Sequence, residues 1–358
     1  MVKMSRVNAV LNNMEKLGLE QIAISDPVSV YYLTGVYFDT EERFLALYLN
    51  RNGALRLFLN NMFSAPNDLK IEMVRFNDWD PYLKTFGDSL QHDKPLGVDK
   101  YLLAQHLLPL IDMKCVPGFV NGSPCVDIAR AVKDEEERQA MREISAINDQ
   151  AMGKYYNLLH EGITEQEVSN RMKEITQDFG ADDLSFPPSV CFGANAAVGH
   201  YRSGRVPLRK GDCILIDTGC KKNGYCSDMT RTFFCGEPTE RQKEIYMLVA
   251  GAVEAAESVL GPGVRLCDID RAAREHIEKG GFGKYFTTRL GHFIGLQVHD
   301  FGDVSAANKN QTVPGNIFSI EPGIYIPGEI GVRIEDLVLI TEDGCEILNH
   351  YPKDIQIV

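Results

Sequence analysis

The first third of the chain alternates between helix-like and strand-like hydrophobic patterns. The helix-like stripe near the N-terminus comprises Val7, Val10, Leu11, Met14 and Leu17. The strand-like runs lie at residues 21–25, 44–49 and 55–59. Apolar residues with a period near 3.6 predict an amphipathic helix, and short apolar runs bounded by turn residues predict strands. Alternation of the two patterns predicts an α/β layered domain.

Longer helical patterns and strand-rich segments make up the rest of the chain. One helical pattern begins near Asp134 and is expected to end at Gly162. Two further helix starts are predicted by the capping-box sequences Thr164-x-x-Glu167 and Thr239-x-x-Gln242. Strand-rich segments lie between and after these helices, which favours an α+β domain with antiparallel sheet.

The change between the two patterns falls in a stretch of turn residues. Residues 117–124 have the sequence PGFVNGSP, and Pro, Gly, Asn and Ser favour turns and linkers. The chain has 358 residues, which is enough for two domains of ordinary size. We therefore predict two domains, which span residues 1–125 and 126–358.

Composition and charge disfavour several classes of protein. The formal net charge is −13 and no basic stripe is evident, which disfavours a nucleic-acid partner. No apolar run has the length needed to cross a bilayer, and the N-terminus lacks the apolar segment of a secretory signal. Nine cysteines without a CxxC pair favour free thiols in a reducing compartment. We therefore expect a cytoplasmic protein without nucleic-acid or membrane partners.

A predicted hairpin carries two aspartates. Asn223-Gly224 is a strong signal for a two-residue hairpin loop. With that loop, Asp217 faces Thr230, and Asp228 lies two residues before Thr230 on the same sheet face. The aspartates are then diagonal neighbours, about 7–8 Å apart at the backbone, and could share one or two cations. Alternatively, one aspartate is a turn residue and the other faces solvent, although Asp217 follows the apolar run Cys-Ile-Leu-Ile.

A second predicted hairpin repeats the arrangement with two glutamates. If residues 327–329 form a three-residue loop, Glu321 faces Glu335 directly, whereas a bulge at Gly323 or Gly331 would change this register. Like charges opposite each other destabilise a sheet unless a positive charge lies between them. A bound cation could supply that charge. Alternatively, Arg333 could form a salt bridge with one of the two glutamates, because it shares a face with Glu335 on a regular strand.

Three of the eight histidines lie in apolar segments or in loops rich in small residues. His292 lies between Gly291 and Phe293 in the run RLGHFIGL, where close backbone approach is expected. His299 follows in the sequence QVHD, and His200 ends the small-residue loop GANAAVGH. The other five histidines lie in polar or helical surroundings and are expected to be incidental.

Taken in order, these motifs resemble those of the pita-bread metallopeptidases, which include methionine aminopeptidase, aminopeptidase P, prolidase and the metal-free creatinases. The matching positions are Asp217 in ILIDTG, Asp228 in YCSDMTRTF, His292 in GHxIG, Glu321 in EPG and Glu335 in GxRxED. Residues 32–35 are similar to the YLTG element of the prolidase and creatinase N-terminal domain. The resemblance covers nearly the whole chain and is strongest to the prolidase and aminopeptidase P branch.

The resemblance implies a fold and a metal site. The expected fold is an α/β N-terminal domain of the creatinase/prolidase type, followed by an α+β catalytic domain of the pita-bread type. The expected ligands of two divalent metal ions are Asp217, Asp228, His292, Glu321 and Glu335. Four carboxylates and one imidazole suit Mn²⁺, with Co²⁺ and Zn²⁺ as alternatives.

The resemblance also implies roles for residues beside the metals. Glu321 would carry a proton from the attacking water. His200 and His299 would hydrogen-bond the substrate carbonyl and the oxyanion. Arg333 would orient acids or substrate. Phe293 stands where the family commonly has Gly, a difference that could reshape the substrate pocket.

The activity implied by the resemblance is hydrolysis of the peptide bond before proline. An Xaa-Pro dipeptidase, or prolidase, is favoured because the short chain resembles the compact bacterial prolidase-like enzymes. An Xaa-Pro aminopeptidase acting on longer peptides is the first alternative, and a non-catalytic binding protein on the same fold is the second. The expected partners are small peptides with proline in the second position and, by analogy, a second copy of the chain in a homodimer.

Overall fold

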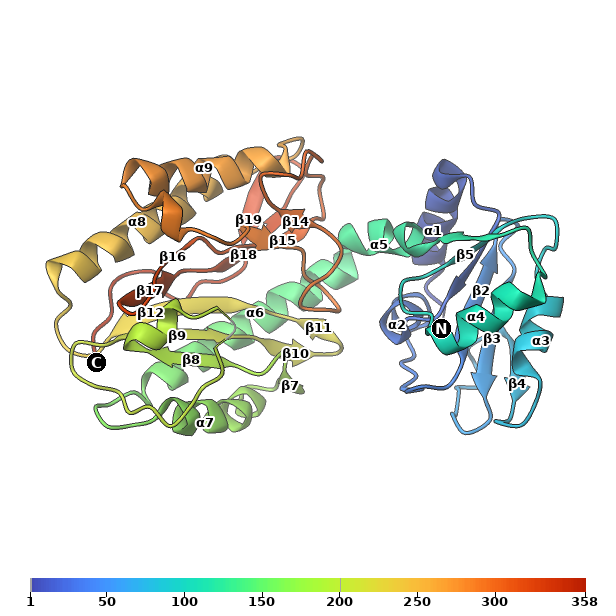
Figure 1. Cartoon of the computed structure of the whole chain (residues 1–358), viewed down its shortest axis with the longest axis horizontal. Helices are drawn as coiled ribbons and strands as arrows, with labels where there is room; N and C mark the ends of the chain where they lie inside the picture. The colour runs from blue at the N-terminus through green and yellow to red at the C-terminus, as the bar shows by residue number, and fades with distance from the viewer. Residues whose placement is uncertain (1, 200) are drawn as a thin grey trace. The chain divides into compact units, whose positions relative to one another are not determined.

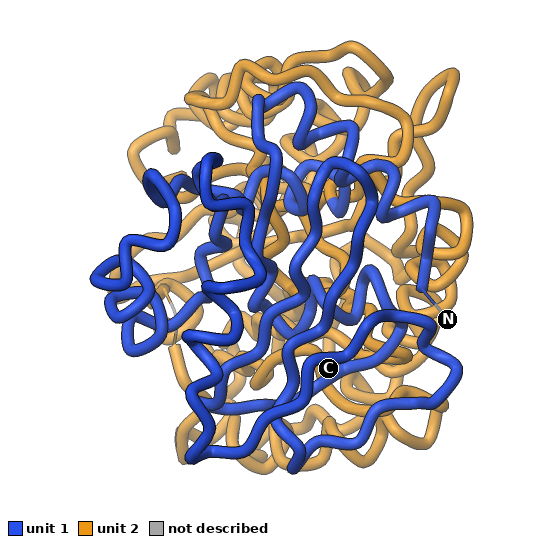
Figure 2. Tube along the Cα trace, turned by 90° about the vertical axis from the view of Figure 1, so that its right-hand side faces the viewer, with its two compact units in different colours: residues 1–130 blue, residues 131–358 orange. Residues whose placement is uncertain are grey.

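The computed structural model describes residues 2–199 and 201–358. The chain divides into two compact units, Met1–Arg130 and Ala131–Val358, which Figure 2 distinguishes by colour. The predicted division after residue 125 falls within helix α5 (Ser123–Ala131), and the assignment of domains to residues 1–125 and 126–358 stays a prediction. No helix of the described residues is both long enough and apolar enough to cross a membrane.

The first unit is a mixed sheet packed against helices (Figure 1). Its helices are α1 (Met4–Leu17), α2 (Pro27–Thr34), α3 (Tyr82–Asp88), α4 (Ala104–Met113) and α5. Its strands are β1 (Gln21–Ile24), β2 (Leu45–Asn50), β3 (Leu55–Asn60), β4 (Glu72–Phe76), β5 (Leu96–Val98) and β6 (Phe119–Asn121). The strand order is β4-β3-β2-β1-β5-β6, with antiparallel pairs at β1–β2 and β2–β3 and parallel pairs elsewhere. This arrangement agrees with the predicted α/β class.

The hydrophobic stripe predicted for the first helix is mostly confirmed. Val7, Val10 and Met14 of α1 are fully buried, and Leu11 is half-buried. Leu17 is exposed at the last residue of the helix. Burial of one stripe is what holds a short amphipathic helix against a sheet, because isolated helices of this length are marginal in water.

The second unit has strands between two pairs of helices. Figure 1 shows α6 and α7 on one side of the strands and α8 and α9 on the other. The helical elements are α6 (Glu135–Tyr156), α7 (Glu165–Asp178), η1 (Gly193–Ala197), α8 (Glu240–Glu257), α9 (Leu266–Lys279) and η2 (Gly283–Tyr285).

The strands of the second unit are short and antiparallel. They are β7 (Asp183–Leu184), β8 (Ser189–Phe192), β9 (Cys213–Thr218), β10 (Cys220–Lys222), β11 (Tyr225–Cys226), β12 (Met229–Phe234), β13 (Gly291–His292), β14 (Asp303–Val304), β15 (Ile317–Ile320), β16 (Gly323–Ile326), β17 (Ile330–Arg333), β18 (Asp336–Ile340) and β19 (Cys345–Ile347). They pair in the orders β12-β9-β8, β11-β10-β7, β13-β14, β15-β18-β19 and β16-β17. This is the predicted α+β organisation.

The predicted helix starts of the second unit are confirmed, whereas one predicted helix end is wrong. Asp134, Thr164 and Thr239 each cap the helix that follows them, and their capping boxes are complete. Helix α6 ends at Tyr156 and does not continue to Gly162. Gly162 has a φ of 92° and donates its N–H to a carbonyl outside the helix, so it belongs to the turn that precedes α7.

The predicted register of both hairpins is confirmed. β10 and β11 flank the Asn223-Gly224 loop, and the outer strands β9 and β12 pair Asp217 with Thr230. In the second hairpin, the β16–β17 and β15–β18 pairs have the same register, because equal numbers of residues separate the two pairs on each arm. That alignment sets Glu321 opposite Glu335, although neither residue lies in a strand.

Both hairpins are interrupted beside their acids. The first ladder breaks at Gly219 and at residues 227–228, and the second at residues 321–322 and 334–335. At the second break, the backbone N–H of Glu335 donates to a carbonyl of β12, and that of Glu321 donates to the residue before β13. Both acids are therefore held by neighbouring segments as well as by their own hairpin.

Gly219 allows the two arms of the first hairpin to approach closely. A Cβ atom at this position would lie 1.9 Å from the carbonyl oxygen of Ser227 and 2.1 Å from Oγ of Ser185. The Ser185 hydroxyl donates to that same carbonyl at 2.9 Å, so the space is already occupied by a hydrogen bond. Any side chain at residue 219 must push apart the arms that carry the two aspartates.

We predict that Gly219→Ala destabilises the fold by about 1–3 kcal/mol or more, as overpacking typically does. The free energy of unfolding, measured by urea denaturation, tests this. Gly261→Ala is the matched control, because no heavy atom of the described chain beyond residues 260–262 lies within 4 Å of a Cβ placed there. Equal stability of the two variants would contradict the steric argument.

Candidate metal centre

The five predicted metal ligands converge from separate parts of the second unit. Asp217 lies in β9, Asp228 precedes β12, and His292 ends β13, while Glu321 and Glu335 lie in the breaks of the second hairpin. Nε2 of His292 lies 3.5 Å from Oδ2 of Asp228 and 3.5 Å from Oε1 of Glu321. The fold thus gathers four carboxyl groups and one imidazole from positions that are distant in the sequence.

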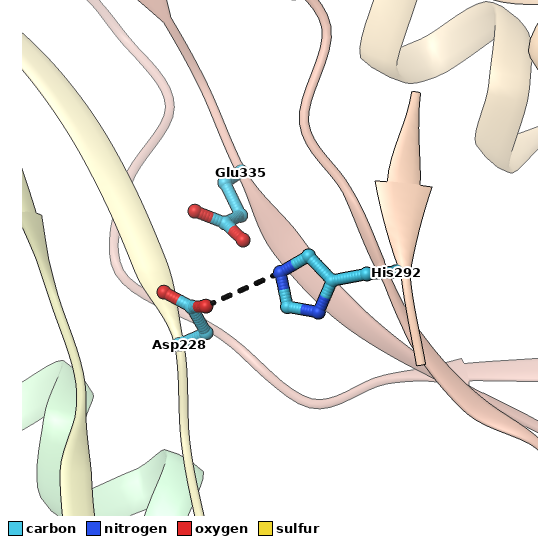
Figure 3. A group of neighbouring side chains, drawn as sticks. All are labelled: Asp228, His292 and Glu335. Carbon is cyan, nitrogen blue, oxygen red and sulfur yellow. Dashed lines mark ion pairs between the residues drawn. The ribbon is translucent and has the colours of Figure 1, made fainter. Parts of the chain in front are cut away.

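Asp228, His292 and Glu335 form the buried part of the cluster, and Figure 3 shows their side chains pointing toward one another. Each offers one ligand atom, and these atoms lie within 4.8 Å of one another. Oδ1 of Asp228 and Oε1 of Glu335 have no hydrogen-bond partner among the described residues. A buried carboxylate oxygen is costly unless a donor or a cation binds it. These donors therefore fit a metal ion.

Asp217 and Glu321 form the more open edge of the cluster. Their side chains are 22% and 21% exposed, against 6% for the side chain of Asp228. The Ser319 hydroxyl donates to Oε1 of Glu321 at 3.0 Å. Water or a ligand can reach the cluster from this edge.

His292 is oriented by two contacts with its surroundings. Its Nδ1 lies 3.2 Å from the carbonyl oxygen of Phe293, and its backbone N–H donates to Ser319 Oγ at 3.0 Å. A proton on Nδ1 leaves the Nε2 lone pair facing the acids, which is the tautomer that a metal-binding histidine needs. The Phe293 ring is buried and packs against Phe318, with 5.4 Å between ring centroids, so it fills the hydrophobic core.

Crowding of the acids raises their pKa values. Burial, followed by the charges of Asp217 and Glu321, raises the pKa of Asp228 well above its ordinary value. Burial, followed by the neighbouring carboxylates, does the same to the pKa of Glu335. Burial also raises the pKa of Asp217, although the Arg333 guanidinium opposes the shift. A divalent cation would reverse these shifts, because a nearby positive charge favours ionised carboxylates.

Arg333 supplies a positive charge at one edge of the cluster. Its Nη2 donates to Oδ2 of Asp217 at 2.6 Å, its Nη1 to the hydroxyl of Tyr325 at 2.9 Å, and its Nε to Oγ1 of Thr230 at 2.9 Å. Its Nε lies 4.0 Å from Oε2 of Glu321. The close partner of Arg333 is therefore Asp217, and the alternative pairing of Arg333 with a glutamate reaches only the limit for an ion pair. One guanidinium cannot neutralise four acids.

Thr230 and Tyr325 also belong to the site, although the sequence pattern alone did not identify them as site residues. The Thr230 hydroxyl donates to Oε2 of Glu335 at 2.7 Å and accepts from Arg333. The predicted register already placed Thr230 opposite Asp217, and this position could have identified Thr230 as a site residue. Tyr325 gave no comparable signal, because it joins the site through the Arg333 side chain.

The two remaining predicted site residues are histidines. His299 is exposed, and its ring lies edge-on to that of His292, with 4.3 Å between centroids and 69° between planes. An exposed imidazole at the margin of the cluster can reach a bound ligand. His200 lies outside the described residues, so its role stays a prediction.

Comparison with known proteins places both units in known families. The model of metallopeptidase family M24 matches residues 139–342, and that of the creatinase/prolidase N-terminal domain matches residues 6–132. An uncharacterized peptidase from Staphylococcus aureus strain MSSA476 is 36% identical over 99% of this chain and 100% of its own length.

Two solved structures also resemble the chain over nearly its whole length. A prolidase from Thermococcus sibiricus is 32% identical, with a TM-score of 0.94 and 100% of both chains covered. An X-Pro aminopeptidase from Thermotoga maritima is 27% identical, with a TM-score of 0.84, 97% of this chain and 100% of its own chain covered.

We predict that the metal-free protein loses stability as pH rises and that Asp228→Asn reduces this loss. The folded-state pKa values of Asp228 and Glu335 are raised, so the protonated acids favour folding below the unfolded-state value of about 4. That contribution is lost as pH rises through the raised folded-state pKa. Melting temperatures measured at several pH values in a chelator should therefore fall toward neutral pH, less steeply in Asp228→Asn.

Saturating Mn²⁺ should stabilise the wild type at neutral pH and stabilise Asp228→Asn much less, because binding to the folded state alone adds stability. Asp93→Asn, at an exposed acid, is the control and should follow the wild type. A metal-free wild type that is equally stable from pH 4 to pH 8 would contradict the electrostatic account.

Proposed function

This chain belongs to metallopeptidase family M24, and from that membership we propose that it is an Xaa-Pro dipeptidase, which hydrolyses the bond before a C-terminal proline. The observation that carries the proposal is the convergence of four carboxyl groups and His292, with two carboxylate oxygens that lack hydrogen-bond partners among the described residues. Full-length similarity to a solved prolidase supports the substrate class. The chain is a peptidase by family, so the non-catalytic alternative is not carried further.

The proposed metal site holds two divalent cations. The proposed ligands are Asp217, Asp228, His292, Glu321 and Glu335. Oxygen donors and one imidazole support Mn²⁺ as the preferred ion, with Co²⁺ and Zn²⁺ as alternatives. When bound, such cations polarise a carbonyl group and lower the pKa of a water molecule.

Glu321 is the acid best suited to move a proton during hydrolysis. It keeps some exposure, unlike Asp228 and Glu335, and so can meet both water and substrate. Its Oε1 accepts from the Ser319 hydroxyl, which fixes the direction of the carboxyl group. Glu321 takes a proton from the water that attacks the carbonyl carbon, and it returns this proton to the proline nitrogen as the C–N bond breaks.

His299 and Arg333 are proposed to serve the reaction in different ways. The exposed ring of His299 can donate a hydrogen bond to the oxyanion that forms on the attacked carbonyl. Arg333 holds Asp217 and Tyr325 in place through two guanidinium nitrogens. His200 is proposed to share the role of His299.

The two candidate activities differ in the length of the peptide that the enzyme cleaves. A dipeptidase must recognise the free carboxylate of its C-terminal proline, for which a bidentate arginine is well suited. Arg333 already donates to Asp217, Thr230 and Tyr325, so it does not offer a free fork to the substrate. This observation and the similarity to the Thermotoga maritima enzyme favour the Xaa-Pro aminopeptidase as the second candidate. A cytoplasmic location and a homodimer stay predictions.

The test compares hydrolysis of Ala-Pro with that of Ala-Pro-Ala in the presence of Mn²⁺. We expect a higher kcat/KM for Ala-Pro, and little activity on the control dipeptide Ala-Ala, which lacks the proline ring. Chelation should abolish activity and Mn²⁺ should restore it. Equal or higher kcat/KM for Ala-Pro-Ala would replace the dipeptidase with the aminopeptidase. Full activity at a metal content near zero would overturn the metal proposal.

We predict that His299→Ala binds Mn²⁺ as the wild type does but turns over about 10²–10³-fold more slowly, the usual effect of losing one oxyanion donor. Turnover number and bound metal, measured on the same preparation, separate the two effects. The matched control is His160→Ala, because His160 is exposed and its Nδ1 contacts only the neighbouring Glu161 carbonyl among the described polar groups. Wild-type turnover in His299→Ala would remove His299 from the reaction.

A further inference from the structure

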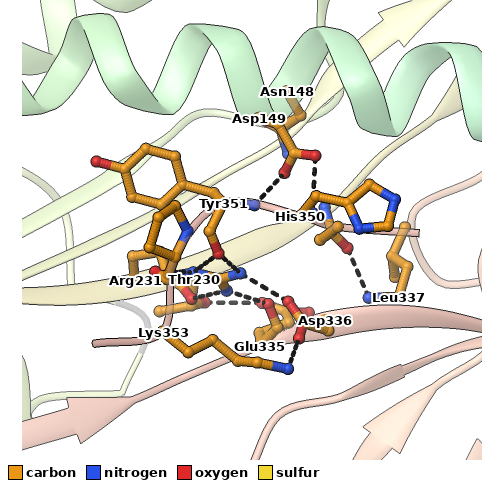
Figure 4. Close-up of polar contacts among 12 residues, drawn as sticks. Asn148, Asp149, Thr230, Arg231, Glu335, Asp336, Leu337, His350, Tyr351 and Lys353 are labelled. Carbon is orange, nitrogen blue, oxygen red and sulfur yellow. Dashed lines mark hydrogen bonds and ion pairs between the residues drawn. The ribbon is translucent and has the colours of Figure 1, made fainter. Parts of the chain in front are cut away.

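A buried arginine lies behind the acid cluster. Arg231 follows Thr230 in β12, and successive side chains of a strand point to opposite faces. The Thr230 hydroxyl therefore faces Glu335, whereas the Arg231 side chain extends behind the sheet and is 1% exposed. Figure 4 shows its guanidinium among backbone carbonyls and Asp336.

One end of the Arg231 guanidinium joins the two hairpins through their backbones. Its Nη1 donates to the carbonyl oxygen of Thr230 at 3.0 Å and to that of Glu335 at 2.6 Å. The backbone N–H of Glu335 also donates to the Thr230 carbonyl, at 3.1 Å. Glu335 lies outside the strands, in the gap between β17 and β18, so this contact holds its backbone where the ladder does not.

The other end of the guanidinium is neutralised within the core. Its Nη2 donates to Oδ1 of Asp336 at 2.7 Å and to the carbonyl of Tyr351 at 2.8 Å. Asp336 is fully buried, and its other oxygen binds Nζ of Lys353, which also pairs with Glu257 at 3.0 Å. A buried charge is tolerated when it is paired and hydrogen-bonded in this way.

From this arrangement, and on the basis of the function proposed above, we propose that Arg231 is a positioning residue of the metal centre. By binding the carbonyls of Thr230 and Glu335 with one nitrogen, it sets the distance between the hairpin that carries the aspartates and the hairpin that carries the glutamates. Repulsion among the four acids acts to separate these hairpins when no cation is present. Arg231 opposes that separation from the far face and leaves the acid oxygens free for metal.

The guanidinium is suited to this task in a way that an ammonium group is not. Arginine presents five donors in a planar fork, whereas lysine presents a compact charge on a flexible stem. Arg231→Lys therefore keeps the positive charge beside Asp336 but cannot bind the same set of carbonyls. Lys353 provides the matched comparison, because it binds the same Asp336 and is not in contact with the carbonyls of Thr230 or Glu335 in the described hydrogen bonds.

The experiment measures Mn²⁺ affinity of the metal-free full chain by calorimetry, with circular dichroism as the check on folding. We expect Arg231→Lys to bind Mn²⁺ about 10–100-fold more weakly, the usual effect of losing a residue that orients a ligand. Lys353→Met should bind with nearly wild-type affinity. Wild-type affinity in Arg231→Lys, or an equal loss in Lys353→Met, would overturn the proposal.

A second variant covers the case in which Arg231→Lys fails to fold. The double variant Arg231→Met with Asp336→Asn removes both charges, so no unpaired ion remains in the core, while Lys353 keeps Glu257 as a partner. It should fold and show the same weakened affinity, and wild-type affinity would overturn the proposal. If the wild type itself binds no Mn²⁺ and cleaves no Ala-Pro, the proposed function fails. If the wild type binds Mn²⁺ and cleaves Ala-Pro, and the variants bind Mn²⁺ with the same affinity, only the proposed role of Arg231 fails.

Discussion

Mutual repulsion among four carboxyl groups is the constraint around which the second unit is organised. Asp228 and Glu335 are buried beside each other with their pKa values raised, a state that folding would avoid if the acids served stability alone. Arg333 offsets part of the charge through Asp217 on the open side. A cation would neutralise the rest of the negative charge. The backbone N–H groups of Glu335 and Glu321 bind neighbouring segments, and these contacts hold the two acids where they could bind a cation.

The interrupted ladders follow from the same constraint. A residue in a regular strand has its backbone direction set by its partner strand, and its side chain can face only one side of the sheet. At the breaks, the backbone of Glu335 bonds to β12 and that of Glu321 to the segment before β13. The direction of each acid is thereby set by a segment other than its hairpin partner. As a result, side chains from the first hairpin, from β13 and from the second hairpin meet at one place.

The sequence predicted the parts of the site that depend on local chemistry. The Asn223-Gly224 loop predicts the register of its hairpin, and counting outward from that loop is enough to pair Asp217 with Thr230. The capping boxes at Thr164 and Thr239 likewise act within a few residues. Three features could not be predicted, because each depends on how the hairpins pack against one another. They are the breaks in the ladders, the pairing of Arg333 with Asp217 and the contacts of Arg231. Gly162 shows the same limit, since a tertiary hydrogen bond placed it in a turn and not at a helix end.

In each hairpin, the pairing register is the same on both sides of the break. This constancy limits where residues can be inserted or deleted. Residues added at a hairpin tip leave both arms unchanged, so the pairing of Asp217 with Thr230 and the opposition of Glu321 and Glu335 survive. One residue added within a single arm, between an acid and the tip, shifts every outer partner by one position and turns alternate side chains to the other face. Related chains can therefore differ in the length of these two tips, whereas a residue gained or lost in one arm between tip and acid must be matched in the other arm.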